Sequence, residues 1–184
     1  METRLVRGAV FGSLACLLAV ITSQAAMAAE KIDKRVAKLF GGTEGLATVS
    51  GATKVEAFRV GEYSKDRKEG KKKDGKESVG GYLVKGKAHK VDKDQLAKFT
   101  KVFKNPETYR FDVAKPCIFG PGVIVRFTKG DSRVEVLLCF SCKELAIYVD
   151  GKETGFEDFD GAKTELVALV KEIFPDDKEI QSLK

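Results

Sequence analysis

Residues 117–140 decide the fold, and they read CIFGPGVIVRFT at 117–128, KGDS at 129–132 and RVEVLLCF at 133–140. The two outer segments are rich in branched and aromatic residues, which suit a pleated sheet. The four residues between them are of the kind that form tight turns. The stretch therefore predicts a β-hairpin that turns at Gly130-Asp131, so that Cys142 faces Phe119 and Cys117 faces Glu144.

Outside this hairpin the sequence has further helix and strand patterns. Helices need apolar residues about every three to four positions, and strands favour branched and aromatic residues. Asp92 and Gln95 form a capping-box pair that begins a helix, and Asn105-Pro106 ends it. On these grounds we expect helices at 31–40, 92–104 and 161–174, a short helical turn at 176–183, and strands at 54–60, 79–91 and 145–149.

The order of these elements indicates the fold class. A helix, two strands, a helix, three strands and a final helix follow one another, without the regular strand–helix alternation of a parallel sheet. We therefore expect an α+β domain with an antiparallel sheet of about five strands and two or three helices packed on one side. The apolar faces Leu96/Phe99/Phe103 and Leu166/Leu169/Ile173 would supply the core.

The beginning of the chain has the pattern of a cleaved signal peptide at residues 1–28. Arg4 and Arg7 precede an apolar run at 9–21, and Ala26-Met27-Ala28 has the form that signal peptidase recognises. About 13 apolar residues are too few for a membrane anchor, and Cys16 lies inside the run, where a lipoprotein would not carry its acylated cysteine. We expect a secreted or periplasmic protein with a single domain at residues 29–184.

Residues 64–77 (SKDRKEGKKKDGKE) hold seven Lys/Arg, four Asp/Glu and no apolar residue. Such a stretch is typical of a solvated, mobile loop. Its positive charge could instead contact an anionic envelope surface. Nucleic acid is disfavoured as a partner, because the stretch has no aromatic side chain to stack on bases.

Three cysteines, Cys117, Cys139 and Cys142, remain after the signal peptide. Thiols tend to pair outside the cytoplasm, so one disulfide and one free thiol are expected. Cys117 and Cys142 lie diagonally on the same face of the predicted hairpin, about 7 Å apart, and a bulge near Gly120-Pro121-Gly122 would bring them together. Cys117–Cys142 is therefore the first choice of disulfide, and Cys117–Cys139 is the second.

Two other hypotheses for the cysteines remain open. Cys139 and Cys142 form a C-x-x-C, which could be a redox pair, although it follows a strand rather than beginning a helix. The three thiolates could also bind zinc, but a structural site needs a fourth ligand, and the single histidine, His89, lies in another segment. We expect neither a metal site nor a cofactor.

No constellation of catalytic residues stands out. His89 has no evident serine and acid to complete a triad, and the sequence lacks a glycine-rich phosphate loop. Glu157, Asp158 and Asp160 precede the last helix, where negative charge stabilises a helix N-terminus without any catalysis. The sequence thus favours a non-enzymatic binding or structural domain held by one disulfide, with a thiol-redox or metal-handling protein as the alternative.

Three short motifs carry a resemblance. Cys117-Ile-Phe-Gly-Pro-Gly-Val, Leu138-Cys-Phe-Ser-Cys142 and Ile173-Phe-Pro-Asp-Asp177, together with the signal peptide, resemble a group of small, uncharacterised secreted or envelope-associated bacterial proteins. The resemblance covers Val55 to Leu183, with the charged loop as a departure. It implies a bacterial origin and a single domain, and it implies no catalytic residue.

Overall fold

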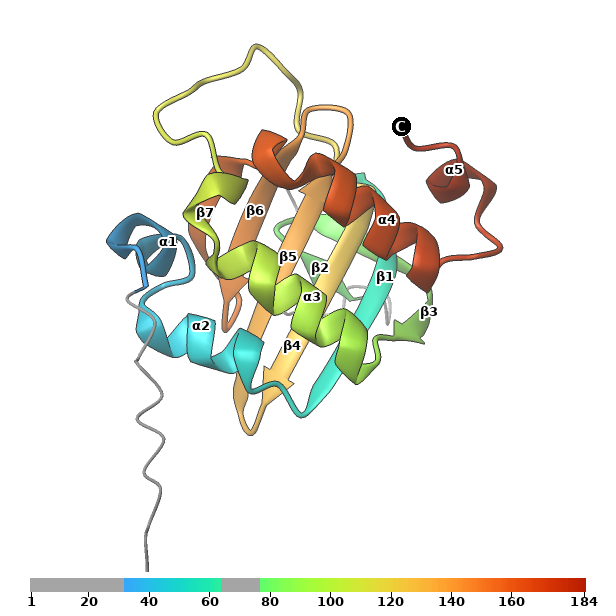
Figure 1. Cartoon of the computed structure of the whole chain (residues 1–184). Helices are drawn as coiled ribbons and strands as arrows, with labels where there is room; N and C mark the ends of the chain where they lie inside the picture. Colours follow the sequence, from blue (N-terminus) through green and yellow to red (C-terminus); the bar gives the residue numbers. More distant parts are fainter. Residues whose placement is uncertain (1–31, 64–76) are drawn as a thin grey trace, which may run out of the picture. The chain divides into compact units, whose positions relative to one another are not determined.

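The computed structural model describes residues 32–63 and 77–184, so the predicted signal peptide and residues 64–76 of the charged loop lie outside it. The described residues form one antiparallel sheet of seven strands in the order β2-β3-β1-β4-β5-β6-β7 (Figure 1). The strands are β1 (Lys54–Tyr63), β2 (Ser78–Val79), β3 (Tyr82–Lys90), β4 (Val123–Lys129), β5 (Ser132–Cys139), β6 (Glu144–Val149) and β7 (Lys152–Asp158).

Five α-helices accompany the sheet within the described ranges. They are α1 (Lys34–Leu39), α2 (Thr43–Ser50), α3 (Lys93–Lys104), α4 (Lys163–Ile173) and α5 (Lys178–Gln181). Figure 1 shows α2, α3 and α4 across the same face of the sheet. Two short 3-10 helices, Pro106–Thr108 and Asp160–Ala162, follow α3 and precede α4.

The predicted α+β class with an antiparallel sheet is confirmed, but the predicted numbers of strands and helices are wrong. The sequence of β7, KETGFED, has four charged residues and a glycine, so it lacks the alternation of a half-buried strand. Helix α2 begins at Thr43, directly after the helix-breaking pair Gly41-Gly42, and it contains Gly45, a poor helix former. Both elements are held by tertiary contacts rather than by local preference.

The central hairpin forms with the predicted turn. Val123 pairs with Leu138, and Lys129 pairs with Ser132 across the turn. The prediction that the first strand begins at Cys117 is wrong, because β4 begins only at Val123. Pro121 has no backbone N–H to donate, and glycines flank it, so this stretch is unsuited to a sheet ladder. Residues 109–122 form an irregular segment instead, called the connecting loop below.

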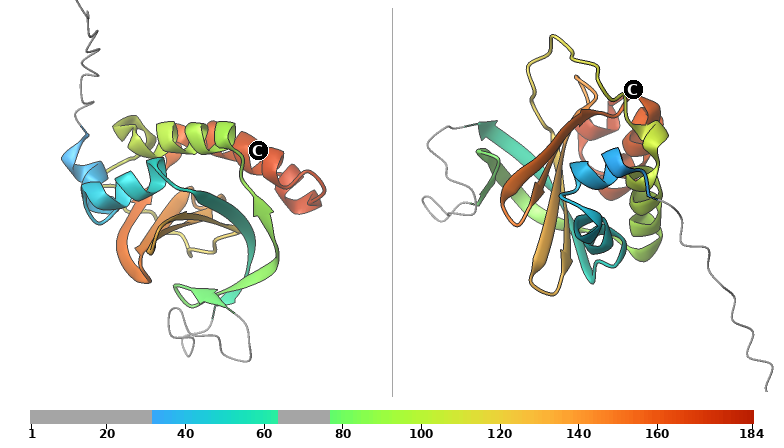
Figure 2. Two further views of the ribbon diagram at one scale, coloured as in Figure 1. Left: turned by 90° about the horizontal axis from the view of Figure 1, so that it is seen from below. Right: turned by 90° about the vertical axis from the view of Figure 1, so that its left-hand side faces the viewer.

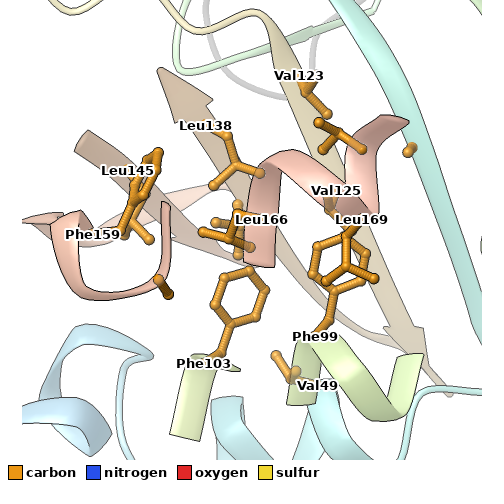
Figure 3. Close-up of a cluster of buried hydrophobic side chains, with 14 of the residues drawn as sticks. Val49, Phe99, Phe103, Val123, Val125, Leu138, Leu145, Phe159, Leu166 and Leu169 are labelled. Carbon is orange, nitrogen blue, oxygen red and sulfur yellow. The ribbon is translucent and has the colours of Figure 1, made fainter. Parts of the chain in front are cut away.

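The main core lies between the helices and the sheet. Figure 3 shows Phe99 and Phe103 of α3, with Leu166 and Leu169 of α4, packed toward side chains of β4 and β5. The predicted capping box at the start of α3 is present: Gln95 N–H donates to the Asp92 carboxylate at 2.8 Å, and Asp92 N–H donates to the Gln95 side chain at 3.0 Å. Apolar periodicity and capping thus locate this layer correctly.

The sheet curls, with the helices on its outer side (Figure 2). Strands β3 and β2 bend round toward the face that the helices leave uncovered. A second, smaller apolar cluster lies on that inner face, formed by Val79, Ile124, Leu137, Ala146 and Tyr148. Phe119 of the connecting loop packs against this cluster. The loop therefore covers part of the inner face of the sheet.

Candidate functional site at the connecting loop

A disulfide joins the connecting loop to the sheet. It links Cys117 to Cys142, with 5.8 Å between their Cα atoms, and this is the pair that the sequence analysis ranked first. Cys117 is exposed, whereas Cys142, in the turn between β5 and β6, is buried. Neither cysteine lies in a strand, so the diagonal distance of a regular hairpin does not apply to them.

Cys139, the other cysteine of the C-x-x-C, is a free thiol with a fully buried side chain. Gly120 N–H donates to its sulfur at 3.4 Å, and the Ser141 hydroxyl lies 3.2 Å from it. Cys139 and Cys142 are therefore not bonded to each other in this structure. The zinc hypothesis required three free thiolates. Because Cys117 and Cys142 are joined in the disulfide, only Cys139 of the three has a free thiol, and the three-thiolate zinc site does not form in this structure.

A cluster of charges fixes the loop beside the disulfide. The Lys115 ammonium forms ion pairs with Asp158 and with Asp160, the latter at 3.0 Å, and it donates to the Cys142 carbonyl at 3.1 Å. Burial, the largest single cause, favours the neutral amine, but the hydrogen bonds and charge interactions with Asp158 and Asp160 together outweigh it and raise the pKa of Lys115. Hydrogen bonding to Lys143, above all, lowers the pKa of Asp160.

The acidic residues before α4 have a different role from the predicted one. Glu157 and Asp158 belong to β7 rather than to the first turn of the helix. The Asp158 carboxylate accepts a hydrogen bond of 2.7 Å from Asp160 N–H, the first backbone N–H of the 3-10 helix at Asp160–Ala162. Its pairing with Lys115 also ties the connecting loop to the edge of the sheet.

Glu144 places a buried carboxyl group next to the disulfide. It begins β6, faces Cys139 on β5 and Asp158 on β7, and is 6% exposed. One of its carboxylate oxygens and the sulfurs of Cys117 and Cys142 all lie within 4.8 Å of one another. Its Oε2 atom has no hydrogen-bond partner in the described part of the chain. Burial raises the pKa of Glu144, and the negative charge of Asp158 adds a smaller increase. The positive charge of Lys115 acts in the opposite direction but does not cancel the effect of burial.

This raised pKa has a consequence for stability. A carboxyl whose pKa is higher in the folded state stabilises the fold while it is protonated, and that stabilisation is lost as the pH rises through the folded-state pKa. We expect Glu144→Gln, which stays neutral, to be more stable than the wild type at pH 7, with the difference vanishing toward about pH 4. Urea unfolding at several pH values measures this. The exposed Glu165→Gln should show no such gain, and an equal gain there would refute the assignment.

Four aromatic rings form a row across the opening of the curled sheet. Tyr63 contacts Tyr82 with 5.0 Å between ring centroids, Tyr82 contacts Phe119 at 6.0 Å, and Phe119 contacts Phe156 at 5.1 Å. The Tyr82 hydroxyl donates to the Phe119 carbonyl at 2.9 Å. We call Tyr63, Tyr82, Phe119 and Phe156 the aromatic row. It runs from β1 and β3, through the connecting loop, to β7.

The aromatic row is accessible to a ligand. Tyr63 is 53% exposed and Phe156 is 46% exposed, while the neighbouring Ile118 is 94% exposed. Ile118 precedes Phe119 in the chain, so a further exposed apolar residue adjoins the linked rings in sequence. Exposed aromatic residues of this kind are enriched at interaction sites. No local sequence pattern indicates this row, because its members are brought together only by the fold.

Two other polar side chains make contacts within the protein. On the inner face, Arg126 forms ion pairs with the buried Glu135 at 2.7 Å and with Glu77 at 2.8 Å, and its guanidinium lies over the Phe58 ring. His89 is exposed on β3, with its ring centroid 4.4 Å from that of Phe174. Neither arrangement brings a nucleophile and a base together.

Comparison with protein-family models, with curated proteins and with solved structures finds no significant match to this chain. The resemblance to small envelope-associated bacterial proteins therefore stays a prediction. Among the described residues, no helix combines the length and the apolar character that crossing a membrane requires.

Proposed function

We propose that this protein is a non-enzymatic binding domain that works outside the cytoplasm and holds an apolar segment of a partner protein along the aromatic row. The observation that carries the proposal is the unbroken series of three contacts among four aromatic rings, with the almost fully exposed Ile118 next to Phe119 in the chain. Aromatic side chains are enriched at protein interfaces, where they supply most of the binding energy.

The way in which the row is held supports binding rather than mere packing. Phe119 lies only two residues from Cys117, so the disulfide restricts the segment that carries Ile118 and Phe119. Lys115 anchors the same segment through its ion pairs with Asp158 and Asp160. A surface whose shape is fixed before binding loses less conformational entropy when a ligand arrives.

The chemistry of the row favours a peptide over a sugar. Sugars stack on flat aromatic faces, whereas Ile118 offers a branched aliphatic side chain. Aliphatic and aromatic groups together suit the apolar side chains of an extended polypeptide segment. The disulfide is also consistent with the export predicted from residues 1–28, because disulfides persist in oxidising compartments.

Selection of peptides tests this proposal. Random peptides displayed on phage are selected on the oxidised domain, and the affinity of the best ones is measured by isothermal titration calorimetry. We expect selected peptides rich in aromatic and branched residues. Phe156→Ala and Ile118→Ser should each weaken their binding about tenfold or more, equivalent to about 1.4 kcal/mol.

Val113→Ser is the matched control, since Val113 lies in the same loop, is 54% exposed and is outside the aromatic row. It should leave the affinity unchanged. Selected peptides whose binding is insensitive to both Phe156→Ala and Ile118→Ser would overturn the proposal. Binding of glycans with the same dependence on Phe156 would replace the peptide by a sugar ligand and would equally contradict it.

A further inference from the structure

The two halves of the disulfide differ in their access to solvent. Cys117 lies exposed in the connecting loop, and Cys142 is only 4% exposed. Solvent access thus favours attack by a thiolate on Cys117 over attack on Cys142. Thiol–disulfide exchange depends on which sulfur is open to attack, so the structure selects Cys117 as the site of attack and Cys142 as the leaving group.

The position of the leaving sulfur makes a proton donor important. A thiolate released in a buried site is unfavourable, because an apolar environment raises the pKa of a thiol. The carboxyl group of Glu144 lies within 4.8 Å of both sulfurs, and its Oε2 atom has no partner among the described residues. A buried carboxyl this close to a buried leaving group can transfer its proton once the released sulfur comes into hydrogen-bond contact with it, directly or through one water.

We propose that Cys117–Cys142 is an exchangeable disulfide that accepts electrons from an exported thiol, with Glu144 as the proton donor to Cys142. This exchange is stoichiometric rather than catalytic, so it goes beyond the non-enzymatic binding function proposed above without contradicting it. It uses a different cysteine pair from the C-x-x-C.

The exchange proceeds in two balanced steps. The thiolate of the substrate attacks Cys117 Sγ, the Cys117–Cys142 bond breaks, and Cys142 Sγ leaves with the electron pair and takes the proton of Glu144. A second substrate thiolate then attacks the substrate sulfur of the mixed disulfide, releasing Cys117 as a thiolate and the substrate as a disulfide. Two substrate thiols are oxidised and one protein disulfide is reduced. Glu144 recovers its proton from solvent.

The charges around Glu144 are consistent with this role. Asp158, paired with it across β6 and β7, disfavours its ionised form, and Lys115 from the connecting loop opposes that effect. Lys115 is already engaged by Asp158 and Asp160, and Lys143 pairs with Asp160. Burial therefore dominates, and the Glu144 carboxyl keeps its proton to a higher pH than an exposed glutamate does.

Reduction by glutathione tests the proposal on the oxidised protein. The second-order rate constant, calculated per glutathione thiolate, is measured from pH 4 to pH 9 for the wild type, for Glu144→Gln and for Glu157→Gln. Glu157 also has a pKa raised by burial, but it is not part of the group around the sulfurs. We expect Glu144→Gln to react at least tenfold more slowly below neutral pH and to lose the dependence on pH, while Glu157→Gln behaves like the wild type.

The site of attack is tested separately with oxidised glutathione. Cys142→Ser should form a mixed disulfide at Cys117 at least tenfold faster than Cys117→Ser forms one at Cys142, as followed by mass spectrometry. Circular dichroism identifies any variant that has unfolded, and only folded variants are compared. If Glu144→Gln were reduced by glutathione at the rate of the wild type and with the same pH profile, the proposal would be overturned. Faster modification of Cys142 than of Cys117 by oxidised glutathione would also overturn it. Neither result would affect peptide binding at the aromatic row.

Discussion

Phe103→Ala is expected to destabilise the domain by about 3–5 kcal/mol, since replacing a fully buried phenylalanine removes its apolar contacts and leaves a cavity. Phe103 is completely buried and contacts the rings of Phe40, Phe99 and Phe127, with centroid distances between 5.6 and 6.1 Å. It thus joins α3 to the segment after α1, through Phe40, and to β4, through Phe127.

Equilibrium unfolding in urea at pH 7 measures this loss. Val113→Ala in the exposed connecting loop is the control, and it should change the free energy of unfolding by no more than about 0.5 kcal/mol. A loss below about 1 kcal/mol for Phe103→Ala would contradict the packing of α3 against the sheet, because such a value is typical of a side chain on the surface.

Cys117→Ser is expected to cost about 3.5 kcal/mol of folding free energy. The disulfide closes a loop with a sequence separation of 25 residues, and the chain-entropy relation for a loop of this size gives that value at 25 °C. Unlike Phe103→Ala, this substitution is made at an exposed residue, so the loss comes mainly from freeing the unfolded chain rather than from a cavity.

Sensitivity to a reductant separates the cross-link from any local effect of the serine. Dithiothreitol should lower the stability of the wild type to near that of Cys117→Ser and should leave Cys117→Ser unchanged. Cys139→Ala, which keeps the cross-link, should remain sensitive to the reductant. A wild type that is insensitive to complete reduction, or a Cys139→Ala variant that has lost the sensitivity, would contradict the pairing.

Local sequence patterns were sufficient for the centre of the fold. Three features depend only on residues close together in the chain, so they can be predicted from the sequence: the turn at Gly130-Asp131, the capping box at Asp92 and the apolar face of α4. Strand β7 could not be predicted from its charged sequence, because contacts with β6 and α1 hold it in place. One of these contacts is the hydrogen bond of 2.8 Å that the Thr154 hydroxyl donates to the Leu39 carbonyl.

The candidate site was predictable only in part. Counting cysteines and considering the faces of the hairpin gave Cys117 and Cys142 as the first pair, and the structure joins those two residues. Glu144 was expected to face Cys117 across the hairpin, but it pairs with Cys139, and its burial as a carboxyl group was missed. The aromatic row was missed as well. Phe119 meets Tyr82 and Phe156 only because the connecting loop folds back over the sheet, and no local pattern encodes that path.

The central claim is that the Cys117–Cys142 bond holds the connecting loop across the sheet, and mapping the cysteines tests it most directly. Protein purified from the exporting host is alkylated under denaturing conditions, reduced, alkylated with a second reagent and digested with trypsin. Cys139 and Cys142 lie in one peptide, residues 134–143, and fragment ions distinguish them. The account predicts the first label on Cys139 and the second on Cys117 and Cys142. A second label on Cys139 with the first on Cys117, which would mean a bond within the C-x-x-C, would contradict it.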